Sequence, residues 1–201
     1  MSSYGNLNST ESLGSEPDLV SGQLIACGKY IVPVGWMFAA SSSDRIRGVS
    51  PEDEFEFFFY RVPKQMALVR LQTAVTTLKR DRYFWSVFHH LEGLVGEISD
   101  APHSRLEIEF SELIAMGHEP FLEQAARAVD ELPSFLASII AGDRSAALKQ
   151  LNSLEELCGM KLTGNSTTDE PAWKGDMKFL GIPTAEELCR WWVRGHFKSE
   201  F

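Results

Sequence analysis

The stretch VPKQMALVRLQTAVTTLKRDRYFWSVFHHLEGLVGEI, which runs from Val62 to Ile98, is the longest periodic segment of the chain and decides its fold class. Apolar residues recur in it at intervals of three and four, the spacing that places side chains on one face of a helix. Pro63 is tolerated at the first position of a helix, where its missing N–H would have had no partner. The pattern predicts two consecutive helices, each with one buried face.

Residues with strand character precede these helices. Residues 23–27 and 30–40 have the β-branched and aromatic content of two short strands joined by a turn. Residues 41–50 are polar enough for a loop. Residues 51–54 predict a helical turn, and the aromatic run FEFFFYRV at 55–62 predicts a third strand directly before the first helix.

A further strand is expected after the two helices. In RLEIEF, at residues 105–110, apolar residues alternate with charged ones, which is typical of a strand with one buried face. The pattern places Glu107 and Glu109 together on the outer face. Two carboxylates there could work as an acid–base pair or bind a cation. Charged residues on a strand more often serve solubility and prevent edge-to-edge aggregation.

The C-terminal part of the chain predicts three more helical regions. Their boundaries are marked by Pro120 and Gly142, by Asp143 and Gly159, and by the capping box that begins at Thr184. A proline inside a helical pattern breaks the hydrogen-bond ladder, so Pro133 is expected to restart the first of these helices. Residues 160–182 form a long polar loop between the second and the third.

Length and element order together predict one α+β domain. A chain of 201 residues is long enough to bury a sizeable core in a single domain. Residues 1–21 are rich in Ser, Asn, Gly and Glu, which predicts a disordered tail. Residues 22–201 are then the domain, a small antiparallel sheet of about three to five strands packed against a layer of about five to six helices.

The charge balance limits the classes of partner. The net charge is −9 and the sequence pI is about 5.1, which argues against nucleic acid because its phosphates require a basic patch. An acidic protein binds basic partners more readily. No secretory signal and no apolar run near the length of about 18 residues needed for a membrane span is found. Three scattered cysteines without a C-x-x-C pair favour a reducing cytoplasm.

No motif for catalysis, a cofactor or a metal is recognisable. The five histidines lack the spacing of metal ligands, and no nucleophile elbow or dinucleotide fingerprint occurs. Residues 22–29 resemble a phosphate loop only briefly, because five residues separate the glycines and Tyr30 stands where Ser or Thr is required. His89 and Glu92, one helical turn apart, leave one alternative, an enzyme of unrecognised type that uses this pair.

The second helix of the opening stretch has an unusual back. A rotation of 100° per residue brings Trp85, His89, Glu92 and Gly96 onto one line opposite the apolar stripe, with Gly93 beside it. The glycines cost helix stability but allow another backbone to approach closely. Two interpretations fit this line. Either another segment of the chain packs on it, or it is a surface for a protein partner.

Two further groups are candidate partner-binding residues. Residues 52–56 contain the densest set of acids, which is either a solvated rim or a patch for a basic partner, and its carboxylates are those of Glu52, Asp53, Glu54 and Glu56. Trp191 and Trp192 are adjacent on the last predicted helix. They either lock the C-terminus onto the domain or act as interface anchors, since Trp carries disproportionate binding energy.

The runs FFFYRVPKQMALVRLQTAVTTLKR at 57–80 and RLEIEFSELIAMG at 105–117 resemble a set of uncharacterised bacterial cytosolic proteins found among polymorphic-toxin immunity genes. The similarity covers about Tyr30 to Leu132 and consists of pattern more than of invariant residues. The resemblance implies an α+β domain that blocks a toxin by binding it, and no catalytic residue comes with it. Together with the acidic composition, it leads to the hypothesis of a non-catalytic inhibitor of a basic toxin such as a nuclease.

Overall fold

Five strands and five α-helices make up the described part of the computed structural model, which covers residues 4–18, 21–29, 34–49, 56–110 and 120–157. The strands are β1 (Tyr4–Thr10), β2 (Gln23–Lys29), β3 (Arg45–Val49), β4 (Glu56–Pro63) and β5 (Arg105–Glu109). The helices are α1 (Val34–Met37), α2 (Lys64–Leu78), α3 (Trp85–Asp100), α5 (Pro120–Ile140) and α6 (Arg144–Leu157). Two single turns of 3-10 helix add to them, at Ser42–Asp44 and at Arg82–Phe84.

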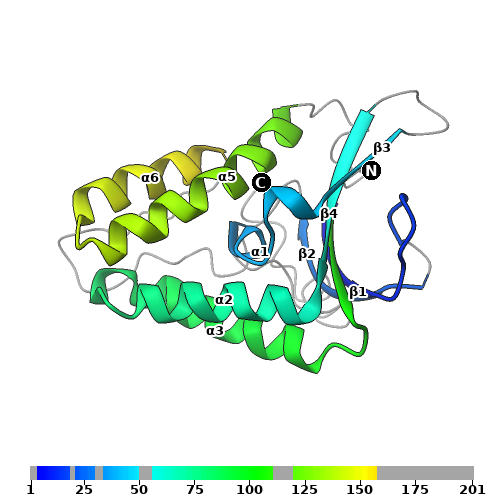
Figure 1. Ribbon diagram of the computed structural model, residues 1–201, viewed down its shortest axis with the longest axis horizontal. Coiled ribbons are helices and arrows are strands. Elements are labelled where there is room, and N and C mark those ends of the chain that lie inside the picture. The colour runs from blue at the N-terminus through cyan, green and yellow to red at the C-terminus, as the bar shows by residue number, and fades with distance from the viewer. Residues whose placement is uncertain (1–3, 19–20, 30–33, 50–55, 111–119, 158–201) are drawn as a thin grey trace, which may run out of the picture.

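The strands form one antiparallel sheet in the order β2-β1-β5-β4-β3, and the helices pack on one of its faces (Figure 1). The central strand β5 pairs with β1 on one side and with β4 on the other, so it joins the pair β1–β2 to the pair β3–β4. This arrangement confirms the predicted α+β class. The described helices include none that is long and apolar enough to cross a membrane.

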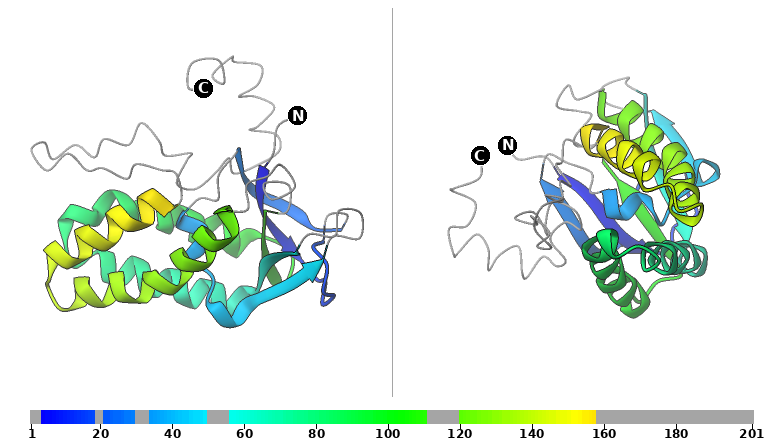
Figure 2. Two further views of the ribbon diagram at one scale, coloured as in Figure 1. Left: turned by 90° about the horizontal axis from the view of Figure 1, so that it is seen from above. Right: turned by 90° about the vertical axis from the view of Figure 1, so that its left-hand side faces the viewer.

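The helical layer consists of two antiparallel pairs, α2 with α3 and α5 with α6 (Figure 2). The periodic faces expected for the first pair are the faces that it buries, with Leu71 and Leu78 on α2 and Leu91 and Ile98 on α3 all fully enclosed. Phe135 of α5 meets the same core. The two helices predicted from the opening stretch are therefore confirmed, with Pro63 directly before α2.

The prediction of a disordered tail is wrong for residues 4–18. Tyr4–Thr10 forms β1, the second strand of the sheet, with Leu7 completely buried. The polar composition suggested disorder. The side chains of Asn8 and Thr10 are nevertheless buried, and the sheet face on which they lie is polar. A strand that buries polar groups against other polar groups lacks the apolar signal by which a sequence reveals it.

The segment around residues 30–50 also differs from expectation. Val34–Met37 is a short helix rather than part of a strand, and every residue in it is buried. A run in which no residue faces water shows no period, so strand and helix cannot be distinguished in it. The loop predicted at 41–50 contains the edge strand β3. Its Arg45 and Arg47 made the segment polar enough to be predicted as a loop, although charged residues are common on edge strands. The helical turn predicted at 51–54 lies outside the described residues.

The first two of the three predicted C-terminal helices are found as α5 and α6, with one correction. The third helix, the loop predicted at 160–182 and the stop predicted at Gly159 lie outside the described residues. α5 continues through Pro133 and does not restart there. A proline inside a helix costs about 3 kcal/mol, and the burial of Leu132 and Phe135 on either side of it keeps both halves packed on the core. Gly142, at φ +74°, ends the turn after α5, and the Asp143 carboxylate accepts a hydrogen bond from the Ala146 amide at 2.9 Å to cap α6.

The thiol of Cys27 is expected to resist alkylation as long as the protein is folded. Its side chain on β2 is 2% exposed, and burial raises the pKa of the thiol to about 11, which suppresses the reactive thiolate at neutral pH. In a variant with Cys158 and Cys189 replaced by serine, a thiol-reactive chromophore should label Cys27 far more slowly in buffer than in denaturant. Equal labelling rates in the two conditions would contradict this burial.

Candidate functional site

Five exposed residues in successive turns of α3 form a surface that we call the α3 outer face. They are Glu92, Gly93, Gly96, Glu97 and Asp100. All five are exposed, and they lie opposite the buried stripe of the same helix. A Cβ atom added at Gly93 or Gly96 would meet no atom within 4 Å. Of the two interpretations of these glycines, packing of another chain segment is therefore not found at either position within the described part of the chain.

The charge of the α3 outer face is negative. The sequence of α3 contains no lysine or arginine. Glu92 Oε1 lies 3.1 Å from Lys79 Nζ, and both side chains are about half exposed. Lys64 Nζ donates instead to the Ala101 carbonyl at 2.7 Å, just beyond the end of the helix. Within the described ranges, no cation pairs with Glu97 or Asp100, so these two carboxylates remain available to a partner.

Several predicted site residues lie outside the described part of the chain, wholly or in their side chains. Trp85 and His89 belong to the first half of α3, but their side chains lie outside the description. The same holds for Glu56 of β4, whose backbone pairs with Val49. Residues 52–54 and 158–201, which include Glu52, Asp53, Glu54, Trp191 and Trp192, lie wholly outside the described residues. Of the line predicted on α3, the structure thus places Glu92 and Gly96 on the outer face.

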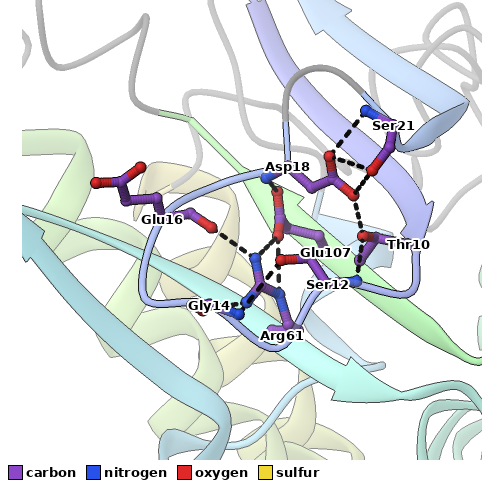
Figure 3. Close-up of polar contacts among 8 residues, drawn as sticks. All are labelled: Thr10, Ser12, Gly14, Glu16, Asp18, Ser21, Arg61 and Glu107. Carbon is purple, nitrogen blue, oxygen red and sulfur yellow. Dashed lines mark hydrogen bonds and ion pairs between the residues drawn. The ribbon is translucent and has the colours of Figure 1, made fainter.

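Glu107 and Glu109 are not on a solvent-facing surface, contrary to the prediction. Both are 0% exposed. The alternation of β5 correctly separates them from Leu106 and Ile108, but the face on which they lie is covered as well. The reason for the burial of Glu107 is a segment of the presumed tail, residues 11–18, which lies across this face of the sheet (Figure 3).

A buried ion pair holds that segment in place. In the sheet, Arg61 of β4 lies directly opposite Glu107 of β5. Arg61 donates to Glu107 Oε2 from Nε at 3.0 Å and from Nη2 at 2.5 Å. It also donates to the carbonyls of Gly14 and Glu16, the latter at 2.7 Å. The Asp18 amide donates to Glu107 Oε1 at 2.8 Å. We call this set of contacts the clasp (Figure 3).

The two ends of the clasped segment have their own contacts. Asp18 accepts hydrogen bonds from the Thr10 hydroxyl and from the Ser21 amide, the latter at 2.9 Å. At the other end, the Glu11 carboxylate accepts from the amide and the hydroxyl of Ser104 at 2.7 and 2.6 Å. These hydrogen bonds lower the pKa of Glu11. Residues 11–18 are therefore held by hydrogen bonds that involve side chains rather than by secondary structure.

The electrostatics of the clasp indicate a structural role. Burial raises the pKa of Glu107, and the hydrogen bonds from Arg61 and from the Asp18 amide offset part of that effect. The Arg61 guanidinium also lies 5.0 Å from the centre of the Phe59 ring. Both oxygens of Glu107 already accept donors, so the carboxylate has little capacity left for a substrate or a cation. In the described ranges, no group of three or more His, Cys, Asp and Glu side chains could hold a metal ion.

Arg61 is the residue that the sequence reasoning missed. It stands in an aromatic run that predicts only a strand, and its partner is 46 residues further along the chain. Knowledge that β4 pairs with β5 could have identified Arg61, because a buried Glu107 needs a basic residue opposite it. Comparison of the chain with protein-family models, with curated proteins and with solved structures gives no match.

Proposed function

We propose that this protein is a non-catalytic binding protein that engages a basic protein partner through the α3 outer face. The more specific form of the proposal is an immunity-type inhibitor that neutralises a basic bacterial toxin, for example a nuclease, by direct contact. The observation that supports it best is the pair Glu97 and Asp100, exposed and free of any described cation, on a helix face that two glycines leave open.

The physical argument has two parts. A net charge of −9 attracts a basic protein over a long range, and complementary charge raises the rate of association more than it lowers the rate of release. Gly93 and Gly96 have no side chain to cover the backbone of α3, so a partner can approach the helix closely. Trp85, on the same helix, is the aromatic anchor expected from the sequence.

The test is a reversal of charge on the α3 outer face. The double substitution Glu97→Lys and Asp100→Lys should abolish binding of the partner, with little effect on folding, because cations are favourable in the last turn of a helix. The matched control is Glu123→Lys with Asp130→Lys, two exposed acids on α5. Each form is immobilised, exposed to host lysate at low and at high salt, and the recovered proteins are identified by mass spectrometry.

The expected result is a basic protein recovered in equal amounts by the wild type and by the α5 control, but not by the α3 variant. Co-expression then tests inhibition, since the wild type should restore growth to cells that produce this partner and the α3 variant should not. Recovery of the same proteins by all three forms would contradict the proposed face. Recovery of no stoichiometric protein even at low salt would contradict the proposed function.

A further inference from the structure

A cleft of about 490 Å³ lies between two turns of the helical layer. Both turns are at the end of this layer that is farthest from the sheet (Figure 1). The cleft is formed where the turn between α2 and α3 meets the turn between α5 and α6. The residues that matter for its chemistry are Lys79, Arg80, Asp81 and Arg144, which are polar, and Phe84 and Ile139, which are apolar. The cleft adjoins the α3 outer face, because Lys79, which lines the cleft, contacts Glu92 of that face.

Among the described residues that line the cleft are three cations and one carboxylate. Both oxygens of the Asp81 carboxylate accept hydrogen bonds from Arg144, at 2.6 and 2.7 Å, so this acid is neutralised by one of the three. Lys79 Nζ contacts Glu92 at 3.1 Å on the rim, with both side chains half exposed. With Arg144 paired to Asp81 and Lys79 to Glu92, the positive charge of Arg80 is left in excess, in a protein whose overall charge is negative.

The side chain of Arg80 is the cation of the cleft that contacts no described polar group. The main-chain amide of Arg80 donates to the Thr77 carbonyl at 3.1 Å, which fixes the backbone beside the cleft. Its guanidinium has no hydrogen bond, ion pair or ring contact with any described residue. A guanidinium presents five donors in a planar fork that matches the oxygens of a carboxylate or a phosphate. The donors of the Arg80 guanidinium are thus available to bind an anion in this cleft.

The apolar part of the lining limits the kind of anion. Phe84 and Ile139 line the cleft and are 1% and 6% exposed, so the apolar area that they offer to a ligand is small. A volume of this size is in the range of pockets that hold small organic molecules. We propose that the cleft binds a small organic oxyanion, a carboxylate or phosphate attached to an apolar body. Arg80 holds the oxygens, and the body lies against Phe84 and Ile139.

Phenyl phosphate is a suitable compound for the test, because it combines an oxyanion with a flat apolar ring. Calorimetric titration of the full chain should show saturable binding of one equivalent, and inorganic phosphate should bind more weakly. Arg80→Ala should weaken the binding of phenyl phosphate by about tenfold or more, since it removes a charge-assisted hydrogen bond. The matched control is Arg127→Ala, which removes an exposed arginine of α5 that does not line the cleft.

Three results would overturn the proposal. Binding that does not saturate at millimolar concentrations would show that the cleft is not a site. Equal affinities for the wild type and for Arg80→Ala would show that any binding is adventitious. Equal affinities for phenyl phosphate and inorganic phosphate would remove the assignment of the apolar body. Arg80 is exposed, so its variant should keep the wild-type melting temperature, and a thermal scan of each variant checks that the comparison is one of binding alone.

Discussion

Replacing Arg61 with methionine is expected to lower the free energy of unfolding by about 3–5 kcal/mol. The substitution removes the cation that faces Glu107 and leaves a carboxylate without its partner in a site that is 0% exposed. It also removes the donors to the carbonyls of Gly14 and Glu16, so the clasped segment loses two of its contacts. Urea unfolding followed by circular dichroism measures the loss.

The pH dependence of this variant follows from the direction of the pKa shift. Burial raises the pKa of Glu107 in the folded state, and the loss of Arg61 removes a group that opposes the rise. The folded variant therefore favours the protonated carboxyl. Its stability is fully present below the ordinary pKa of glutamate and is lost as pH rises through the raised pKa. The difference from the wild type should accordingly shrink as the pH is lowered.

The control for this prediction is the double substitution Arg61→Met with Glu107→Leu. Replacement of both members of a buried ion pair by apolar residues is often neutral or stabilising, so the double variant should recover the part of the loss that comes from the unpaired carboxylate. It does not restore the hydrogen bonds to the carbonyls of Gly14 and Glu16. A loss below about 1 kcal/mol for Arg61→Met alone would correspond to an exposed pair and would contradict the burial of the clasp.

Deletion of residues 1–10 is expected to abolish cooperative folding. β1 lies between β2 and β5, so its removal separates β2 from the sheet and opens an edge of the central strand. It also removes Leu7, which is completely buried in the core. Far-ultraviolet circular dichroism and a urea titration should show loss of strand signal and no sharp unfolding transition.

A substitution in the neighbouring segment serves as the control for the deletion. Leu13 is 77% exposed, so Leu13→Ser should leave the unfolding midpoint unchanged although it lies just beyond β1. A truncated protein that unfolds at the same urea concentration as the full chain would mean that residues 1–10 are dispensable, as a disordered tail would be.

The parts of the fold that could be predicted from the sequence are those with a local pattern. The helices α2 and α3 have their apolar residues at helical spacing, and the aromatic run before them is indeed β4. β1 could not be predicted, because several of its buried residues are polar and one of its two neighbouring strands, β5, lies about a hundred positions away. α1 could not be distinguished from a strand, since a segment that is buried on all sides has no polar face.

The site was predictable only in part for the same reason. Helical geometry placed Glu92 and Gly96 on one face of α3, and the structure places both there. Strand alternation assigned Glu107 to the correct side of β5 but could not reveal that residues 11–18 cover it. The ion pair of Glu107 with Arg61 requires a strand pairing over 46 residues, which no local pattern encodes.

The position of β5 has a consequence for the order in which the chain can fold during its synthesis. A ribosome releases the chain from the N-terminus, so β1, β2, β3 and β4 all emerge before the strand that lies between the two pairs. Until β5 has left the exit tunnel, the pairings of the final sheet that can form are those of β1 with β2 and of β3 with β4, and the edges that β5 covers in the folded sheet stay open. Capture of these two pairs by β5 is a long-range step, which makes it the natural slow event of folding and the stage most exposed to aggregation.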